Sequence, residues 1–424
     1  MPPPDTKTTP AQQGDAKKLV TFPGVPEGTV RRPRDPRIDA FRGLALVMIF
    51  VNHVPGNPYE ALTIRNFTFS DAAETFFIMS GIAAGLAYAG RFLPEARART
   101  GLWHGVAPMW GRSWTLYLAH LFLTAWAMAI YAAASGMFGM PELLAQINLR
   151  PVFATTEEAL FGVAAMTHQL GYVNILPAYT VLLFAGPVLV LLGLWRLGAL
   201  LALSGLLWFA AGLWRLNLPN FPNEGGWFFN PLSWQLLFVV GLAIGLRLRD
   251  GQRLVPRSKP LFALAAGFCL LVLVWKHVPA VAEVLNHQMS RLADLGAPFH
   301  LVSHDKTYVA VPRLLNVLAL AYVLSCLPMV TAASAHRWAA PLRLLGRQGL
   351  IVFCTGTLLS LVLQVIIAGA GEPRWMAWIL PPVGVAIMLG IAWLAMPRKP
   401  IAPRQGSAQA QGGVVARPAG ARAS

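Results

Sequence analysis

Residues 172–194 read YVNILPAYTVLLFAGPVLVLLGL and contain no charged side chain, as is typical of a helix that spans a lipid bilayer. Similar apolar windows recur along the chain, centred on residues 39–55, 70–90, 108–135, 197–214, 232–248, 260–277, 313–332, 348–370 and 376–396. Each window is near the roughly 20 residues that cross the hydrocarbon core. The sequence therefore predicts an all-α, polytopic integral membrane protein of about ten transmembrane helices.

The composition agrees with a membrane protein. The 424 residues are 56% apolar and 12% charged, with mean hydropathy +0.54, whereas soluble domains carry about a quarter charged residues. We expect one membrane domain over residues 37–398, with disordered cytoplasmic tails at 1–36 and 399–424 and an uncleaved first helix. The three cysteines, Cys269, Cys326 and Cys354, lie in apolar windows and are predicted to be free core residues.

The positive charges indicate how the helices are oriented. With the N-terminus in the cytoplasm, the basic clusters between windows all fall on the cytoplasmic side, at Arg91, Arg97, Arg99, Arg196, Arg247, Arg249, Arg253, Arg257, Lys259, Arg337, Arg343, Arg347, Arg398 and Lys399. The positive-inside rule then predicts an even number of helices and two cytoplasmic termini. Because topology accounts for the net charge of +16, we expect no nucleic-acid partner.

The first predicted helix carries an arginine and a histidine on one face. Arg42 and His53 are eleven positions apart, which brings them within about 20° of a whole number of turns and separates them by about 16 Å of rise. Asp39 lies on nearly the same stripe and can pair with Arg42. Alternatively, Arg42 reaches the lipid headgroups and His53 merely caps the helix end.

The second predicted helix brings two acids to the same outer level as His53. Asp71 and Glu74 begin this helix, three residues apart, and an imidazole beside a carboxylate is the arrangement that general-base catalysis on a hydroxyl requires. Either acid can be the partner of His53, and both can instead cap the helix N-terminus. Gly81 and Gly85 form a small-xxx-small pair that predicts helix packing.

These residues carry a resemblance to known membrane enzymes. Arg42, His53 and the segment Glu74-Thr-Phe-Phe-Ile-Met-Ser-Gly81 resemble the acyltransferase-3 superfamily pattern. The segments 69–74, 116–120, 227–238, 304–307 with Arg313, and 345–354 resemble one branch, the OpgC-type succinyltransferases of osmoregulated periplasmic glucans. The wider superfamily often has a histidine where this chain has Cys354, so His53 is expected to act without a second histidine from that helix.

The resemblance implies a bacterial inner-membrane enzyme that transfers an acyl group from cytoplasmic acyl-CoA, here succinyl-CoA, to a periplasmic glucan. His53 is expected to be the general base, oriented by Asp71 or Glu74. Four arginines at predicted cytoplasmic ends can bind the phosphates of coenzyme A: Arg37, Arg42, Arg112 and Arg347. Lipid headgroups would attract the same side chains.

On the outer side, aromatic and amide side chains can bind the acceptor sugar. The candidates are Trp227, Asn230, Trp234 and Gln235, with Tyr117 and His120 added by the resemblance. Lys306 and Arg313 can bind the carboxylate of a succinyl group, which an acetyl group lacks. The tryptophans can instead form an interfacial aromatic belt, and Lys306 can form a surface ion pair.

Other functions remain open at this point. The histidines lack metal-ligand spacing, so we predict no metal site, and no permanently bound cofactor is expected. A saccharide transporter or flippase would also have many helices, but the chain shows no internal repeat. A lipid-linked-sugar glycosyltransferase, or an acyltransferase acting on another surface polysaccharide, are further alternatives. The sequence also allows a homodimer.

Overall fold

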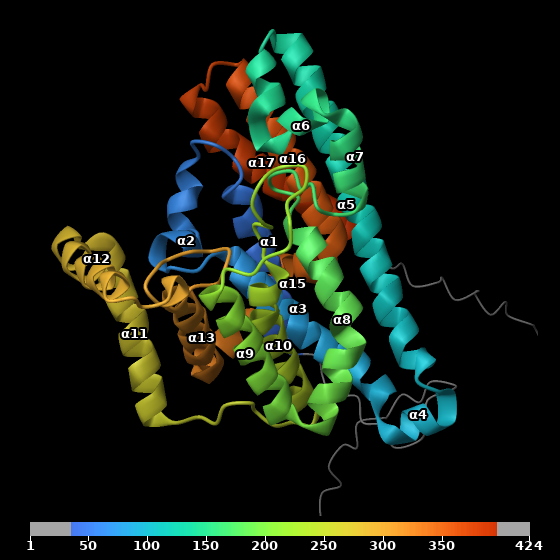
Figure 1. Ribbon diagram of the computed structural model, residues 1–424, viewed down its shortest axis with the longest axis vertical. Coiled ribbons are helices and arrows are strands. Elements are labelled where there is room, and N and C mark those ends of the chain that lie inside the picture. The colour runs from blue at the N-terminus through green and yellow to red at the C-terminus, as the bar shows by residue number, and fades with distance from the viewer. Residues whose placement is uncertain (1–34, 397–424) are drawn as a thin grey trace, which may run out of the picture. The chain divides into compact units, whose positions relative to one another are not determined.

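The computed structural model describes residues 35–396, and this part of the chain is helical without β-strands (Figure 1). The α-helices are α1 (Pro36–Val51), α2 (Ile64–Phe67), α3 (Ala72–Tyr88), α4 (Pro94–Thr100), α5 (Trp103–Phe138), α6 (Arg150–Ala154), α7 (Thr156–Ala164), α8 (Ile175–Trp195), α9 (Leu197–Leu213), α10 (Pro231–Arg249), α11 (Lys259–His277), α12 (Pro279–Asp294), α13 (Val311–Cys326), α14 (Pro328–Ala335), α15 (Ala340–Arg347), α16 (Gly349–Gly369) and α17 (Arg374–Leu394). Short 3₁₀ segments are η1 (Pro58–Leu62), η2 (Ala89–Phe92), η3 (Pro141–Asn148), η4 (Phe299–Leu301) and η5 (Arg337–Ala339). The predicted tails lie outside the described residues, apart from Asp35 and Pro36.

The helices show a multi-pass membrane protein, and all ten apolar windows fall on helices. Among residues 35–396, seven helices are long and apolar enough to cross a bilayer: α3 continued by η2, α5, α8, α10, α11, α16 and α17. An eighth span is possible if α13 and α14, which are bent by 78°, form one broken span. Because α1 and α9 are shorter, the count of ten and the side of each terminus stay predictions.

Two pairs of glycines bring α3 and α10 into backbone contact. A Cβ atom at Gly81 would lie 2.0 Å from the carbonyl oxygen of Phe238, and one at Gly241 would lie 2.1 Å from that of Ile78. Gly85 and Gly245 repeat this contact one turn further along. The predicted packing role of Gly81 and Gly85 is confirmed, and their partner is a second small-xxx-small pair on α10.

The helix that carries Arg42 is fixed in the same way. Gly43 on α1 packs against the backbone of α15, where an added Cβ would lie 1.9 Å from the carbonyl oxygen of Leu342. In return, a Cβ at Gly346 would lie 1.9 Å from the carbonyl oxygen of Asp39. Since neither glycine leaves room for a side chain, α1 and α15 lie together with little freedom to slide.

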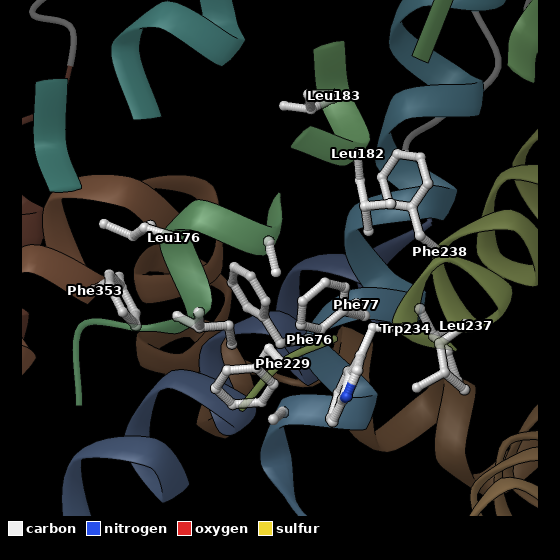
Figure 2. Close-up of a cluster of buried hydrophobic side chains, with 14 of the residues drawn as sticks. Phe76, Phe77, Leu176, Leu182, Leu183, Phe229, Trp234, Leu237, Phe238 and Phe353 are labelled. Carbon is white, nitrogen blue, oxygen red and sulfur yellow. The ribbon is translucent and has the colours of Figure 1, made fainter. Parts of the chain in front are cut away.

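An aromatic core joins α3 to α10 and to the segment that precedes α10 (Figure 2). Phe77 and Trp234 are fully buried, with ring centroids 4.9 Å apart, and Phe229 lies 4.7 Å from Trp234. Phe76 packs against Tyr179 of α8 and Phe353 of α16. This core holds the start of α3 beside the residues that form the candidate site.

Candidate active site

A cavity of about 600 Å³ lies at the end of α1 that carries His53. We call it the outer cavity, because the predicted topology places this end outside. Its walls come from the end of α1, the start of α3, the segments 171–175 and 228–229, and the loop that precedes α13. Four cations line it, namely Arg65, Lys276, Lys306 and Arg313, together with one carboxylate, Asp71.

His53 lies just beyond the last residue of α1 and lines the outer cavity. Asn57 ends the helix by donating to the carbonyl oxygens of Val51 (2.9 Å) and Val54 (2.6 Å). Gln364 of α16 donates to the carbonyl oxygen of His53 at 2.8 Å, and the ring of Tyr172 lies edge-on to the imidazole with centroids 4.5 Å apart. The imidazole is therefore positioned by contacts distant in sequence.

Burial lowers the pKa of His53 to about 4, with a further contribution from Lys306, while the charge of Asp71 acts to raise it. The imidazole is thus neutral at pH 7, which is the form that accepts a proton. Its Nδ1 is buried without a hydrogen-bond partner among the described residues. The other ring nitrogen, Nε2, is the one left to meet a ligand in the cavity.

Asp71 and Glu74 form a capping box at the start of α3. The Asp71 side chain accepts from the backbone N–H of Ala73 at 2.8 Å, and the Glu74 side chain accepts from that of Asp71 at 2.9 Å. The capping role considered as an alternative is therefore present. It satisfies two of the N–H groups that a helix start leaves unpaired.

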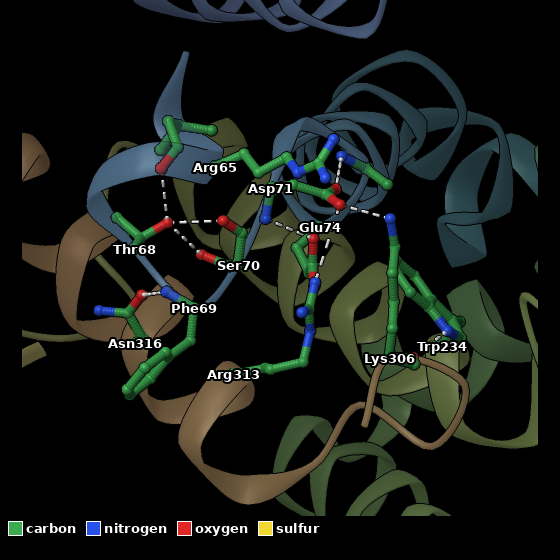
Figure 3. Close-up of polar contacts among 12 residues, drawn as sticks. Arg65, Thr68, Phe69, Ser70, Asp71, Glu74, Trp234, Lys306, Arg313 and Asn316 are labelled. Atoms are coloured by element: carbon green, nitrogen blue, oxygen red, sulfur yellow. Dashed lines mark hydrogen bonds and ion pairs between the residues drawn. The ribbon is translucent and has the colours of Figure 1, made fainter. Parts of the chain in front are cut away.

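The same two acids hold two cations, and Figure 3 shows the four side chains pointing toward one another. The Lys306 ammonium pairs with Asp71, and the Arg313 guanidinium binds Glu74 through Nε at 2.9 Å. Although burial of Asp71 would raise its pKa, the charges of Lys306 and Arg313 hold this pKa below its usual range. Asp71 therefore stays ionised at neutral pH.

The acids thus differ in their relation to His53. Asp71 lines the outer cavity together with His53, whereas Glu74 is fully buried and lines neither cavity. Neither acid forms a hydrogen bond with the imidazole within residues 35–396. Asp71 is therefore the acid that shares the outer cavity with His53, whereas Glu74 holds Arg313.

A smaller cavity of about 180 Å³, the inner cavity, lies at the other end of α1. Arg42, Arg112 and Arg347 all line it, although they come from α1, α5 and α15. Arg347 is also held by Asp39, with Nε 3.2 Å from Oδ2. Of the four predicted phosphate-binding arginines, three converge here, whereas Arg37 donates to the carbonyl oxygen of Ser325 and lines neither cavity.

The two cavities share one lining residue, Phe353 of α16. Its side chain is 4% exposed, and its ring lies 6.3 Å from that of Phe76, which lines the inner cavity. Helices α1, α3 and α8 also reach from one cavity to the other. Phe353 and Phe76 therefore stand between two compartments that lie along the same helices.

The structure places the predicted sugar-binding residues of the outer side away from both cavities. Trp227, Asn230, Trp234 and Gln235 are buried and line neither cavity. Asn230 caps α10 by accepting from the backbone N–H of Leu232, while the two indoles donate to backbone carbonyl oxygens. Gln235 binds Ser204. Their burial and completed hydrogen bonds are those of groups that hold a fold together, so the sugar-binding role stays a prediction.

Two further candidates also lie away from the cavities. Tyr117 donates to the carbonyl oxygen of Ala164 at 2.9 Å, and His120 is fully buried within α5. Neither lines a cavity. The phenylalanine and tyrosine side chains that do line the outer cavity are Phe69, Tyr172, Phe228, Phe229 and Phe353.

Sequence reasoning missed several residues that shape the site. Gln364 carries no motif, and its contact with His53 joins positions 311 residues apart. Asn316 fixes the start of α3 by accepting from the backbone N–H of Phe69, which no local pattern predicts. A signal existed only for Asn57, since an asparagine shortly after an apolar run commonly ends a helix.

Comparison with known proteins gives one match. The family model described as OpgC protein matches residues 34–399, which is most of the chain and includes both cavities. No curated protein matches the sequence.

Proposed function

Since the chain belongs to the OpgC family, we propose that it transfers a succinyl group from cytoplasmic succinyl-CoA to a hydroxyl of a periplasmic glucan, with His53 as the general base. Family membership indicates a membrane enzyme of the acyltransferase type that acts in osmoregulated periplasmic glucan modification. The observation that carries the finer proposal is the arrangement of two cavities at opposite ends of α1. One holds His53, and the other holds three arginines.

The inner cavity supports the donor half of this proposal. Three guanidinium groups facing one space can bind phosphate groups bidentately. Coenzyme A carries its phosphates at the end remote from the thioester, so the pantetheine arm would extend from Arg42 toward His53. The helix from Arg42 to its last residue, Val51, rises by about 14 Å, and the arm must cover this span to approach His53.

Phe353 and Phe76 support a closed resting state of this path. Because Phe353 lines both cavities, its ring must move before a thioester can pass from one to the other. A closed aromatic wall also keeps water in the outer cavity away from the donor. Exclusion of water limits hydrolysis of the thioester.

The chemical step uses groups that face the outer cavity. Nε2 of His53 removes the proton from a glucosyl hydroxyl as the oxygen attacks the thioester carbonyl carbon. The carbon–sulfur bond then breaks, and the sulfur of coenzyme A takes the proton from the imidazolium. Asp71, whose charge favours the imidazolium, stabilises that cation during the reaction.

The test is glucan acylation by purified protein in detergent, with succinyl-CoA and glucan added and products read by mass spectrometry. His53→Ala is expected to lower the rate by about 10²- to 10⁴-fold, which is the usual contribution of a general base. The matched control is His287→Ala, since His287 is exposed on α12 and lines neither cavity. A His53→Ala enzyme with wild-type rate would refute the assigned base.

The same assay separates the enzyme from a transporter. In detergent no compartments remain, so a transporter produces no acylated glucan. The control is glucan isolated from cells that produce the protein. If this glucan carries the ester but the purified wild-type protein leaves added glucan unmodified, the acyltransferase proposal fails.

A further inference from the structure

The outer cavity contains more positive than negative charge. Three of its four cations have a carboxylate partner: Arg65 pairs with Glu60 at 2.7 Å, Lys306 with Asp71, and Arg313 with Glu74. The fourth, Lys276, has no carboxylate within ion-pair distance among residues 35–396. One positive charge at the cavity therefore lacks a counter-ion from the described chain.

The Lys276 ammonium is held in place by backbone groups. It lies near the end of α11, and Nζ donates to the carbonyl oxygens of Arg65 (2.5 Å) and Thr68 (3.0 Å). His277 Nε2 donates to the carbonyl oxygen of Asn66 at 3.0 Å, so the end of α11 is joined to residues 65–68 at several points. An ammonium has three N–H donors. Two are engaged, and one remains for a ligand.

The surroundings strengthen attraction for an anion. Phe69, Tyr172, Phe228 and Phe229 form much of the cavity wall, and charges interact more strongly beside such apolar surfaces than in water. Arg65 belongs to the segment 65–68 that Lys276 binds. The side chains of Arg65 and its partner Glu60 are 56% and 40% exposed. Exposed pairs are weak, so the Arg65 guanidinium can also turn toward a bound anion.

We propose that Lys276, assisted by Arg65, binds the free carboxylate of a dicarboxylic acyl group while its thioester carbonyl lies at His53. This inference rests on the proposed function and deepens it, because it names the residue that selects an acid-ended acyl chain. It also replaces the sequence-based expectation that Lys306 and Arg313 bind this carboxylate, since both are already neutralised by Asp71 and Glu74.

The test compares two donors of equal chain length, succinyl-CoA and butyryl-CoA, which differ in the terminal carboxylate. The acceptor is a glucan without charged substituents, so the donor chain is the only variable anion. Lys276→Met is expected to lower the ratio of kcat/KM for succinyl-CoA over butyryl-CoA by about 10- to 100-fold, as loss of a charged hydrogen bond predicts. Lys276→Arg should retain most of the ratio.

The matched control is Lys259→Met, which removes the lysine at the other end of the same helix, away from the cavity. It should leave the ratio unchanged. If Lys276→Met lowers both rates equally, Lys276 only supports the loop at residues 65–68, and the proposal is overturned. The same assay is repeated with a glucan that carries anionic substituents. If Lys276→Met lowers the rates with succinyl-CoA and butyryl-CoA only for this charged glucan, Lys276 binds the acceptor, and the proposal is overturned.

A second readout does not depend on turnover. Free succinate should raise the melting temperature of wild-type protein more than chloride at equal ionic strength, and Lys276→Met should abolish this difference. If neither donor is used but succinate still protects only the wild type, the proposed reaction fails while the anion site stands. Equal protection of wild type and variant overturns the anion site.

Discussion

Removing one partner of the buried pair of Glu74 and Arg313 should cost more stability than breaking an exposed ion pair, such as that of Arg65 with Glu60. The Glu74 side chain is 0% exposed and that of Arg313 is 12% exposed. Arg313→Met leaves a buried carboxylate that keeps one backbone donor, the N–H of Asp71. Removing one partner of a buried pair costs about 3–5 kcal/mol, and we expect this variant near the upper end.

Glu74→Gln should cost less, near about 3 kcal/mol, because Arg313 keeps a second acid. Its Nη2 lies 3.8 Å from Asp71 Oδ2. The double variant Glu74→Gln with Arg313→Met should lose less unfolding free energy than the sum of the two single losses, by up to about 3 kcal/mol. The reason is that neither member of the buried pair is then left as an unpaired charge.

The assay is unfolding of the purified protein in mixed micelles by increasing SDS, followed by far-UV circular dichroism. The control is Arg65→Met, which breaks an exposed pair and should cost at most about 1 kcal/mol. If Arg313→Met and Arg65→Met shift the unfolding free energy equally, the pair at the start of α3 does not hold this region together, and the reasoning from burial is wrong.

Three further outcomes follow from the geometry. Gly81→Val should abolish the folded fraction in size-exclusion chromatography, because its Cβ would lie 2.0 Å from a carbonyl oxygen of α10. The control Gly111→Val, in open space on α5, should fold. Equal yields of the two variants would contradict the close contact. Phe353→Ala should join the two cavities. In a chain without its native cysteines, an impermeant thiol reagent added outside should then label Ser80→Cys, which lines the inner cavity. Absence of labelling would contradict the shared wall. Because the pKa of His53 is lowered to about 4, its base form persists as pH falls. The value of kcat/KM should therefore stay level from pH 7 to about 5.5, and an inflection near 6.5 would contradict the burial of the imidazole.

The sequence predicts the membrane fold well because the hydrophobic requirement is local. Each span must be apolar by itself, so windows such as 172–194 identify helices without knowledge of their neighbours. The length of α1 is different, since Asn57 ends it at Val51 by binding carbonyl oxygens that the apolar run leaves free. Helix ends depend on such contacts, which explains why fewer helices than windows are long enough to span.

The candidate site is predictable only where helical spacing determines it. Arg42 and His53 are placed at opposite cavities by the length of α1, since Arg42 lies near its start and His53 follows its last residue. Trp234 and Gln235 are the opposite case, because an aromatic beside an amide has the same pattern whether it binds a sugar or fills a core. Only the packing of α10 against α3 decides that they are buried.

The glycine contacts also indicate which groups between the outer and inner cavities can move. The backbones of α3 and α10 are in contact, and so are those of α1 and α15. Each of these two helix pairs must therefore move as one rigid body. On α16, by contrast, a Cβ at Gly356 would meet side-chain atoms, the methyl carbon of Met388 at 3.1 Å and the Cβ of Phe50 at 3.7 Å. A rotation of the Phe353 side chain alone would open this wall, while the two helix pairs that carry Arg42 and Asp71 stay in place.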